Sequence, residues 1–562
     1  MNRLCRFAFI ALAVALAEPA SAFPRTDSQM RDAARQVLSR RTALRKAPGT
    51  PTASLRELKR QDQLSIYGYT EGGFAVVARD DSQRAILGYS DSTFDPVANP
   101  ALGWWLSAME EALAQRRAEE NDQDEPVLVF KPVENFMTTK WSQDSPYNFL
   151  CPEQDGQSSL TGCIATAMAQ CLKYLRYPES SEGESYWTYL NEKPHHEVQL
   201  NTTFRYDEME DSYPRPFYRP ELKEPLAELL RDCGYAAHMQ YSVSGSGTYN
   251  YCAAAGLTAN MRFPVDNICF MQRRLYTQYE WVQTIYNELM QRRPVIYTGV
   301  DNSLRAGHAF VLTGIDVEGL VYVNWGWKGQ SDGFFDLADL SVSGILGNNG
   351  VMHYTAQQQM VCGITPEEKA AVPLHGRSLW GLPSSESQYN LKIGVKDTVG
   401  VAQNLYNYHY QPFSGTIALC LERLDVPENY AFALVQLSKN DAYYPMEGMG
   451  MESFAVLNEL PAAKYKAYIA SRRDDEDGFW PVRSQLGAQY FLLTRSEDGT
   501  LTLSEPMTDE TMGIKPTVSS QTGGISTTSY YDLNGRRQDN PRPGQMVVRR
   551  SGGKVTKLIY SR

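Results

Sequence analysis

The sequence lacks the features that mark several common protein classes. Its 562 residues carry a formal net charge of −11 at pH 7, which argues against a nucleic acid as the main partner. Beyond the first residues, no stretch is apolar for long enough to span a membrane, so we expect no transmembrane segment. The nine cysteines form neither a dense framework nor a CxxC unit, so their spacing does not indicate a disulfide scaffold.

Motifs for metal ions and phosphates are missing as well. His195 and His196 lie in a polar segment without a third suitably spaced ligand, and no HExxH sequence occurs. Gly245 and Gly247 do not stand between a strand and a helix, as a phosphate-binding loop requires. We therefore expect no metal ion and no cofactor.

The first residues have the pattern of a secretory signal. Arg3 and Arg6 precede an apolar run at residues 7–17, and ASA at residues 20–22 fits a small-residue cleavage site. The alternative is a retained membrane anchor, but this apolar run is too short to span a bilayer. We expect residues 1–22 to be a signal peptide and the remainder to be exported.

Cys163 stands at the start of a predicted helix. Residues 161–168 read TGCIATAM, and the small residues before the thiol favour a tight turn. Ile164, Met168, Leu172 and Leu175 then recur at helical spacing. A helix N-terminus stabilises a thiolate through its dipole and unpaired N–H groups, so Cys163 is a candidate nucleophile. The alternative is a small buried hydrophobe, the more common role of a lone cysteine.

A histidine and a side-chain amide follow far along the chain. Residues 306–312 read AGHAFVL and residues 321–329 read VYVNWGWKG; both indicate buried strands, with His308 and Asn324 near strand ends. A papain-type peptidase has a thiol, then a histidine about 130–150 residues on, then an amide that orients the imidazole. His308 lies 145 residues after Cys163, and Asn324 follows. This order favours catalysis over the alternative of a core histidine.

These segments resemble the streptopain family of secreted bacterial cysteine peptidases, which belongs to the papain clan. The resemblance extends over residues 130–365. The matching segments are QDSPYN at 143–148, TGC at 161–163, ATA at 165–167 with Gln170, KY at 173–174, YP at 177–178, GHAFV at 307–311, VNWGW at 323–327 and SDGFF at 331–335. The generic papain signature, with a second cysteine and an aromatic residue just after the nucleophile, is absent, as it is in streptopain-like enzymes.

The resemblance implies a catalytic role for five residues. Cys163 would be the nucleophile and His308 its general base and acid. Gln143 would supply the oxyanion-hole amide beside the Cys163 backbone N–H, while Asn324 and Trp325 would hold the imidazole. Without the resemblance, Gln143 is an ordinary loop glutamine.

Substrate contacts are implied at two further places. By resemblance, Ser244, Gly245 and Ser246 border the substrate subsites, as do Val300 and Gly307. The sequence alone describes residues 242–247 only as a small, flexible surface loop.

The chain is too long for one hydrophobic core, because single cores rarely extend beyond about 250–300 residues. The expected fold class is α+β. It comprises an α+β propeptide at 23–130, a papain-like two-lobed catalytic domain at 131–365 and an all-β, sandwich-like accessory domain at 370–510. Within the catalytic domain, helices are expected at 222–233 and 280–291, with strands from 294 onward.

Residues 23–130 have the pattern of a small separate domain. Helices are expected at 30–44 and 104–114, strands at 64–69, 73–78 and 85–89, and an acidic linker at 119–126. The alternative is an N-terminal domain that stays attached. GGFAVVA at 72–78 and LGYS at 87–90 resemble the inhibitory propeptide of the family, which implies that Asn99 contacts the active site. We expect the chain to be inactive until it cuts itself between residues 116 and 140.

The C-terminal part reads as short alternating strands, at 391–395, 415–421 and 490–493 among others. An adhesive or docking role is an alternative to a stabilising one. A Ser-, Thr- and Gly-rich linker at 515–528 leads into the segment 525–562, which resembles the sorting tails of type IX-secreted proteins. The alternative for its basic residues is a solvated face.

The leading hypothesis is a zymogen cysteine endopeptidase, secreted or held at the bacterial cell surface. Its partners would be protein or peptide substrates and its own propeptide, which would act as an intramolecular inhibitor. Another papain-like acyl transferase or amidase remains an alternative, because the order of Cys163, His308 and Asn324 fits it too. An adhesin or haemagglutinin-like binding protein is the alternative from a different class.

Overall fold

The computed structural model describes residues 24–44, 54–70, 72–116, 130–214, 221, 223–276, 278–301, 306–337, 358–367, 379–381, 390–394, 397–424, 432–445, 447–475, 479–484, 487–488, 490–505, 507, 529–531, 546–551 and 554–559. The predicted signal peptide and the two predicted linkers lie outside the described residues. The chain divides into two compact units, Met1–Phe94 and Asp95–Arg562.

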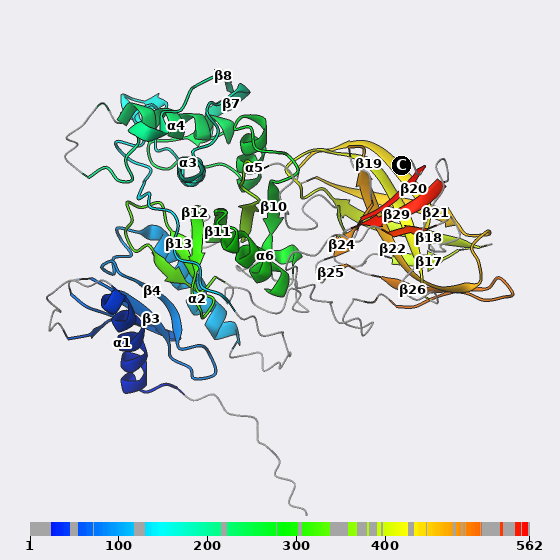
Figure 1. Ribbon diagram of the computed structural model, residues 1–562, viewed down its shortest axis with the longest axis horizontal. Coiled ribbons are helices and arrows are strands. Elements are labelled where there is room, and N and C mark those ends of the chain that lie inside the picture. The colour runs from blue at the N-terminus through cyan, green and yellow to red at the C-terminus, as the bar shows by residue number, and fades with distance from the viewer. Residues whose placement is uncertain are drawn as a thin grey trace, which may run out of the picture. The chain divides into compact units, whose positions relative to one another are not determined.

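The first unit is an antiparallel sheet that carries one helix (Figure 1). Its strands pair in the order β1-β2-β3-β4, and α1 packs on β3 with Met30, Ala34 and Leu38 buried one turn apart. The elements are α1 (Asp27–Leu44), β1 (Arg56–Arg60), β2 (Leu64–Gly68), β3 (Phe74–Ala78) and β4 (Ile86–Ser90).

Two features of this unit differ from the sequence expectation. Helix α1 begins three residues before the predicted start because Thr26 and Gln29 form a capping box. The Thr26 N–H donates to Gln29 Oε1 at 2.8 Å, and the Gln29 N–H donates to Thr26 Oγ1 at 3.3 Å. Strand β1 was not expected, since its sequence RELKR is exposed throughout and shows no apolar alternation.

Helix α2 (Pro100–Arg116) belongs to the second compact unit, although it lies inside the range predicted as one N-terminal domain. It begins four residues before the predicted helix. Asn99 caps it, with the Leu102 N–H donating to Asn99 Oδ1 at 3.1 Å, and Pro100 suits the first helical position. The helix therefore has two start signals that apolar periodicity does not reveal.

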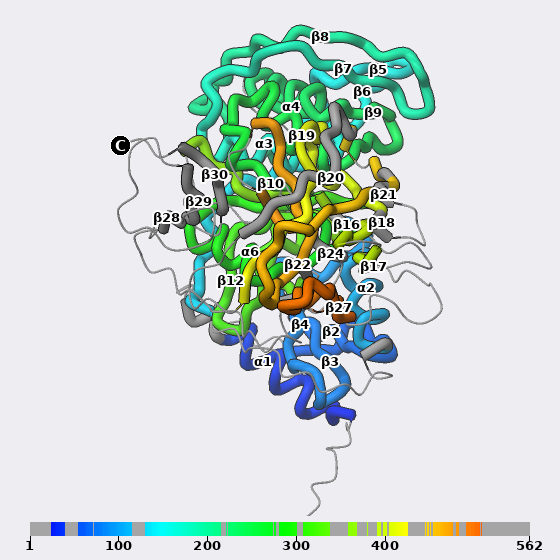
Figure 2. The backbone as a smooth tube through the Cα atoms, turned by 90° about the vertical axis from the view of Figure 1, so that its right-hand side faces the viewer, coloured from blue at the N-terminus to red at the C-terminus, as the bar shows by residue number. Residues whose placement is uncertain are grey.

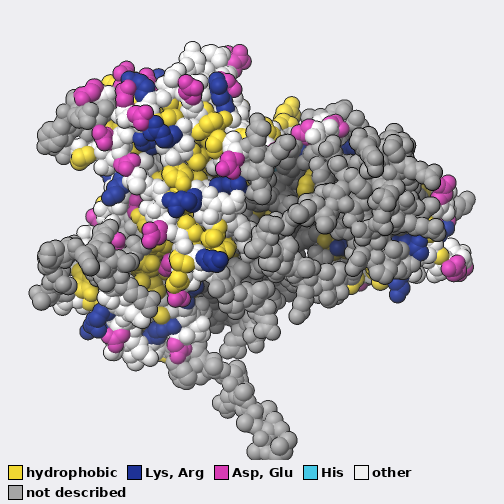
Figure 3. All heavy atoms as spheres, viewed as in Figure 1, with side chains coloured by type: hydrophobic (Ala, Val, Ile, Leu, Met, Phe, Trp, Pro, Cys, Tyr) yellow, Lys and Arg dark blue, Asp and Glu magenta, His cyan; other side chains and the backbone are white. Residues whose placement is uncertain are grey.

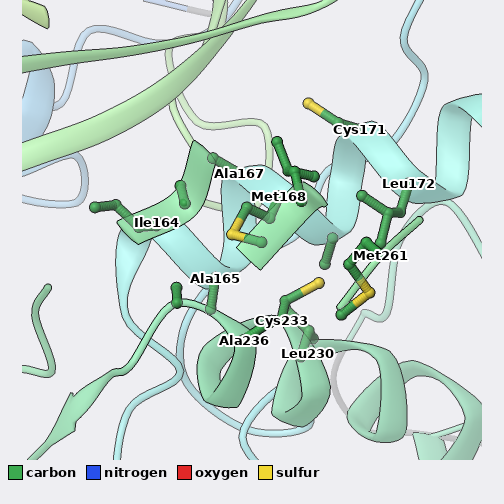
Figure 4. Packing of buried hydrophobic residues seen from close by; sticks show 14 of the residues in the cluster. Ile164, Ala165, Ala167, Met168, Cys171, Leu172, Leu230, Cys233, Ala236 and Met261 are labelled. Carbon is green, nitrogen blue, oxygen red and sulfur yellow. The ribbon is translucent and has the colours of Figure 1, made fainter. Parts of the chain in front are cut away.

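The first half of the predicted catalytic domain is helical. Its core is formed by α3 (Cys163–Leu175), α4 (Lys223–Ala236) and α5 (Asn250–Ala259). Figure 4 shows Met168 and Leu172 of α3 facing Leu230 and Cys233 of α4. Small strands border the helices and can be followed in Figure 2: β5 (Glu153–Gln154), β6 (Gln157–Ser158), β7 (Gly183–Tyr189), β8 (His196–Leu200) and β9 (Gln240–Tyr241).

The second half is an antiparallel sheet of order β14-β13-β12-β11-β15-β10. Its strands are β10 (Cys269–Gln272), β11 (Val295–Asp301), β12 (Ala306–Ile315), β13 (Val321–Asn324), β14 (Gly333–Phe335) and β15 (Gln359–Cys362). Helix α6 (Gln278–Met290) packs on β11 and β12, and α3 contacts the same two strands. Ile164 of α3 shares a buried core with Ile296, Ala309 and Val311 of the sheet. The two halves meet along this core.

The predicted accessory domain is a β-sandwich. One sheet has the order β17-β18-β16-β24-β25 with β21 beside β18, and the other has the order β20-β19-β22-β26-β27 with β23 beside β22. Val399 and Val401 of the first sheet share a core with Ile417, Leu419 and Ile469 of the second. The strands are β16 (Trp380–Gly381), β17 (Asn390–Ile393), β18 (Thr398–Tyr406), β19 (Phe413–Arg423), β20 (Phe432–Tyr443), β21 (Gly448–Val456), β22 (Ala463–Arg473), β23 (Trp480–Pro481), β24 (Arg483–Ser484), β25 (Gly487–Ala488), β26 (Phe491–Arg495) and β27 (Leu501–Leu503).

The tail forms a three-stranded antiparallel sheet of β28 (Ser529–Tyr531), β29 (Met546–Ser551) and β30 (Lys554–Ile559). Within the described part of the chain, no helix has the length and apolarity needed to cross a membrane. Acidic and basic side chains are interspersed on the coloured surface seen in Figure 3. All cysteines in the described ranges are free, and Cys163 alone among them is not fully buried.

Candidate active site

The turn before α3 places Cys163 at the first residue of the helix. Gly162 has φ 85° and ψ 143°, a conformation that a side chain would strain, and a Cβ there would lie 2.7 Å from the Met239 side chain. The first N–H groups of a helix have no partner within it, so they point toward whatever lies at its start. The backbone N–H groups of Ala309, Ile164 and Cys163 itself favour the thiolate form of Cys163 and so lower its pKa. Backbone groups of both the helix and the strand therefore favour the charged sulfur.

The histidine reaches the same place from the sheet. His308 lies near the start of β12, directly opposite Gly299 of β11. Cys163 and His308 line one small pocket together with Gln170, Phe310 and Trp325. The packing of α3 on β12 thus brings together two residues that are far apart in the sequence.

The imidazole is bonded through Nε2. This nitrogen lies 2.9 Å from the main-chain carbonyl oxygen of Trp325, and the Trp327 indole N–H lies 3.1 Å from the same nitrogen. A neutral imidazole nitrogen either donates or accepts in the ring plane, so the two bonds belong to different tautomers. With the proton on Nε2, the carbonyl accepts it and Nδ1 keeps a free lone pair.

Asn324 holds the peptide group beside the imidazole and does not bond to the ring. Its Oδ1 accepts the Gly326 N–H at 3.1 Å, and Gly326 N–H shares its peptide plane with the Trp325 carbonyl. Its Nδ2 donates to the carbonyl oxygen of Thr139 at 2.7 Å and to Gln170 Oε1 at 3.0 Å. The main-chain oxygen of Trp325, one residue after the amide that the sequence also implicated, contacts the imidazole instead.

Burial opposes charge at both reactive groups. It raises the pKa of the Cys163 thiol, and the three backbone N–H groups at the sulfur offset only part of this effect. Burial also lowers the pKa of His308 to about 4, against the smaller raising effect of the bond to Trp325. At neutral pH each group therefore favours its neutral form in the full-length chain.

Gln143 lies next to the cysteine turn. Its backbone oxygen accepts the Thr161 N–H at 3.1 Å, two residues before the thiol. The Gln143 side chain is nearly buried, and its amide makes no hydrogen bond to any other described residue. The amide is therefore available for a ligand.

The implied substrate contacts fall in two groups. Ser246 Oγ accepts the Ser242 N–H at 3.0 Å, and the Ser246 backbone oxygen lies 3.3 Å from where a Gly162 Cβ would be. Ser244 bonds within the same loop, its hydroxyl 3.0 Å from that of Ser242. The loop, which includes Gly245, therefore lies beside the cysteine turn. On the sheet, Val300 and Gly307 are paired across β11 and β12, and the Val300 side chain lies outside the described residues.

Asn99 and α2 pack within the second unit. The Asn99 side chain is fully buried, and its Nδ2 donates to the Gln330 backbone oxygen at 2.8 Å. Trp104 places its indole where a Gly299 Cβ would stand, with ring atoms 2.0–2.1 Å from that position. Since Gly299 pairs with His308, the indole covers the sheet beside this histidine.

Sequence reasoning missed four residues of this site. Gln170 lines the pocket and Trp327 reaches the imidazole. Asp332 Oδ1 accepts the Trp325 N–H at 2.9 Å, and partial burial raises the pKa of its carboxyl to about 7 against the opposing effects of that bond and of Lys140. Trp104 is the fourth. Gln170 had a readable signal, since it lies two helical turns after Cys163 and is a polar residue within the buried stretch of the helix.

No metal centre accompanies these groups in the part of the chain that the structure describes. There, no three His, Cys, Asp or Glu side chains lie close enough together to hold an ion. The arrangement of thiol, imidazole and backbone donors is that of a papain-like thiol peptidase.

Comparisons with known proteins identify the family. The model of the Peptidase C10 family matches residues 141–335. A fragment of Prevotella intermedia prointerpain A is 34% identical and has a TM-score of 0.50, with coverage of 56% of this chain and 100% of the fragment. Streptopain from Streptococcus pyogenes is 28% identical over 371 residues, which cover 61% of this chain and 92% of streptopain.

A longer relative is the thiol protease/hemagglutinin PrtT of Porphyromonas gingivalis. It is 29% identical over 376 residues, which cover 61% of this chain but 43% of PrtT. The chain belongs to the Peptidase C10 family of streptopain-like cysteine peptidases. The expected family, the papain-like fold class and the cysteine-type peptidase activity are thereby confirmed.

The pKa of His308 leads to a prediction about acid stability. Its folded pKa of about 4 lies below the ordinary value of 6.5, so the unfolded chain takes up a proton that the folded chain does not. The contribution of His308 to the free energy of unfolding is fully present above pH 6.5. It decreases as the pH falls from 6.5 to 4, by no more than about 3 kcal/mol in total. We expect the difference in unfolding free energy between Cys163→Ala and Cys163→Ala/His308→Gln to shrink over this range. Parallel pH curves for the two proteins would contradict the assignment.

Proposed function

We propose that this cysteine peptidase is a secreted zymogen that hydrolyses peptide bonds within proteins, with Cys163 as nucleophile and His308 as general base and acid. The observation that carries this proposal is the shared pocket in which α3 presents the thiol and β12 presents the imidazole. The Nε2 bond to the Trp325 carbonyl leaves Nδ1 free to accept the thiol proton. Export is supported by the signal pattern at residues 1–22.

The proposed reaction has two halves. Nδ1 of His308 takes the proton of Cys163, and the thiolate attacks the carbonyl carbon of the scissile bond. The tetrahedral intermediate collapses when the imidazolium gives its proton to the departing amine, which leaves a thioester on Cys163. Water then gives a proton to Nδ1 and attacks the thioester, and the carboxylic acid departs as the thiol is restored.

Two donors are proposed for the oxyanion. The Cys163 backbone N–H stands at the start of α3, and the Gln143 amide lies beside the cysteine turn without another described partner. Donors that are fixed before the reaction stabilise the developing charge without reorganising. The loop containing Ser244, Gly245 and Ser246 would border the acyl side of the substrate, with Val300 and Gly307 on the facing strands.

Latency is supported by contacts of residues 95–116. Trp104 covers Gly299 opposite His308, and Asn99 bonds to Gln330, five residues after Trp325. Burial of the dyad keeps both groups neutral, which suits an enzyme that is not yet active. The prointerpain A fragment, whose name marks a pro-form, aligns over its whole length with this chain. The propeptide is proposed to end between residues 116 and 140.

The first test exchanges the two cysteines of α3 separately. Cys163→Ala should abolish casein hydrolysis and leave the circular dichroism spectrum unchanged, because the covalent step is lost while little packing is removed. Cys171→Ala is the matched control: its thiol is buried on the same helix, and activity should persist. Activity of Cys163→Ala near that of wild type would refute the assignment of the nucleophile.

The second test concerns the oxyanion. Gln143→Ala should lower kcat by about 10²–10³-fold if the amide stabilises the transition state. KM should change little, since the donor acts after binding. Gln157→Ala, on the exposed strand β6, provides the control. An unchanged kcat in Gln143→Ala would assign the second donor to another residue.

The third test concerns activation. Wild type should shorten by its N-terminal part during incubation, whereas purified Cys163→Ala should stay at full length on a denaturing gel. Asn99→Ala and Trp104→Ala should shorten the lag before casein hydrolysis, because each removes a contact of the proposed prosegment. Val97→Ala is the control in the same segment, since Val97 is 88% exposed. Full activity of uncut wild type would refute latency, and equal processing of Cys163→Ala would refute self-cleavage.

A further inference from the structure

The carbonyl that contacts His308 is held on both sides of the Trp325 Cα. The preceding peptide is fixed through the Trp325 N–H, which donates to Asp332 Oδ1 at 2.9 Å. The following peptide, which includes the carbonyl itself, is fixed through the Gly326 N–H on Asn324 Oδ1 at 3.1 Å. Because these two peptide planes set φ and ψ of Trp325, they determine where its carbonyl oxygen lies.

The Trp325 side chain is fixed by the same segment. Its indole Nε1–H donates to the Ser331 backbone oxygen at 3.0 Å, and the residue is completely buried. Ser331 and Asp332 therefore hold two different groups of one residue. The third polar group of Trp325, its carbonyl oxygen, lies at hydrogen-bond distance from His308 Nε2.

The loop that carries Asp332 has an unusual backbone. Lys328 and Ser331 have φ of 57° and 62°, values that residues with side chains rarely adopt. Several hydrogen bonds hold the loop in this form, among them the bond from the Lys328 N–H to the Trp141 carbonyl at 3.1 Å and the bond from the Gln330 N–H to the Trp327 carbonyl at 2.9 Å. Such outliers persist only where surrounding contacts enforce them, and they concentrate at functional sites.

We propose that Asp332 is a positioning residue for His308, which it holds in its catalytic orientation through the main chain of Trp325. The described residues offer the Trp325 N–H no acceptor other than Asp332. Without the carboxylate, a buried N–H loses its partner and the peptide is free to rotate. The Trp325 carbonyl then moves relative to Nε2, and Nδ1 moves relative to the Cys163 thiol. This role of the bond between the Trp325 N–H and Asp332 rests on the proposed role of His308 in peptide hydrolysis, but it is independent of latency and secretion.

The experiment compares Asp332→Ala with Asp332→Asn. Asparagine retains an oxygen that can accept the Trp325 N–H, whereas alanine removes it. In Asp332→Ala we expect kcat per titrated active site to fall by about 10²-fold, since misplacement by about 1 Å has an effect of this size. KM should stay within about twofold, and in Asp332→Asn kcat should return to within about threefold of wild type.

The control is Asp316→Ala. Asp316 also accepts backbone N–H groups, those of Glu318 and Leu320 at 2.9 Å each, but in the turn between β12 and β13 at the other end of these strands. Asp316→Ala removes a carboxylate that accepts backbone N–H groups but does not contact Trp325, so kcat should be unchanged. A second readout is the rate at which iodoacetamide alkylates Cys163, which requires no substrate binding and should fall in parallel with kcat in Asp332→Ala.

Three results would overturn the proposal. The first is a kcat of Asp332→Ala within twofold of wild type after active-site titration. The second is a kcat that is lowered equally in Asp332→Asn and Asp332→Ala, and the third is a kcat of Asp316→Ala that falls as far as that of Asp332→Ala. Asp332→Ser, which fills part of the volume but cannot span the distance to the Trp325 N–H, takes the place of Asp332→Ala if the alanine variant does not fold. A wild-type chain that is active without processing would refute latency, and the ratios between variants would still decide the role of Asp332.

Discussion

The hydrogen bond between His308 Nε2 and the carbonyl oxygen of Trp325 connects the two strands on which this active site is built. A carbonyl can only accept, so the bond requires the proton on Nε2 and leaves Nδ1 for the thiol. The side-chain amide familiar from papain-type sites is present as Asn324, but it acts one step away, on the Gly326 N–H. The orientation of the imidazole thus depends on main-chain geometry, and several buried side chains serve to fix that geometry.

Burial and charge compete throughout the site. Cys163 and His308 are only partly exposed, and this loss of solvation disfavours both the thiolate and the imidazolium, as the opposite pKa shifts of the two groups show. Backbone N–H groups at the start of α3 and on β12 offset part of the cost of the thiolate. As main-chain groups held by the helix and the strand, they need no side-chain ordering to favour the negative charge.

The contact between Trp104 and Gly299 shows how a small residue can allow two segments to meet. Gly299 pairs with His308, and only the lack of a side chain there allows the Trp104 indole to approach the sheet. Asn99 combines two functions, since its Oδ1 caps α2 and its Nδ2 bonds to Gln330. The start of α2 and its attachment to the loop after Trp325 therefore depend on one side chain.

Much of this molecule could be predicted from the sequence because the signals are local. The apolar spacing after Cys163 predicts α3, the runs around His308 and Asn324 predict β12 and β13, and the family motifs predict the fold class, which the structural comparison confirms. Strand β1 and the starts of α1 and α2 escaped this reasoning, because an exposed edge strand has no alternation and caps act outside the apolar pattern. The spacing of apolar residues therefore indicates neither the edge strand nor the capped helix starts.

The sequence by itself determined which residue types were available: a thiol at a helix start, a histidine on a strand, and an amide followed directly by an aromatic residue. Only the tertiary structure decided which atoms meet. That the imidazole contacts the Trp325 carbonyl rather than the Asn324 amide, that Asp332 holds the Trp325 N–H and that Trp104 lies on Gly299 all depend on side-chain direction and backbone φ and ψ. These are set by packing between segments far apart in the chain, for which neighbouring residues give no signal.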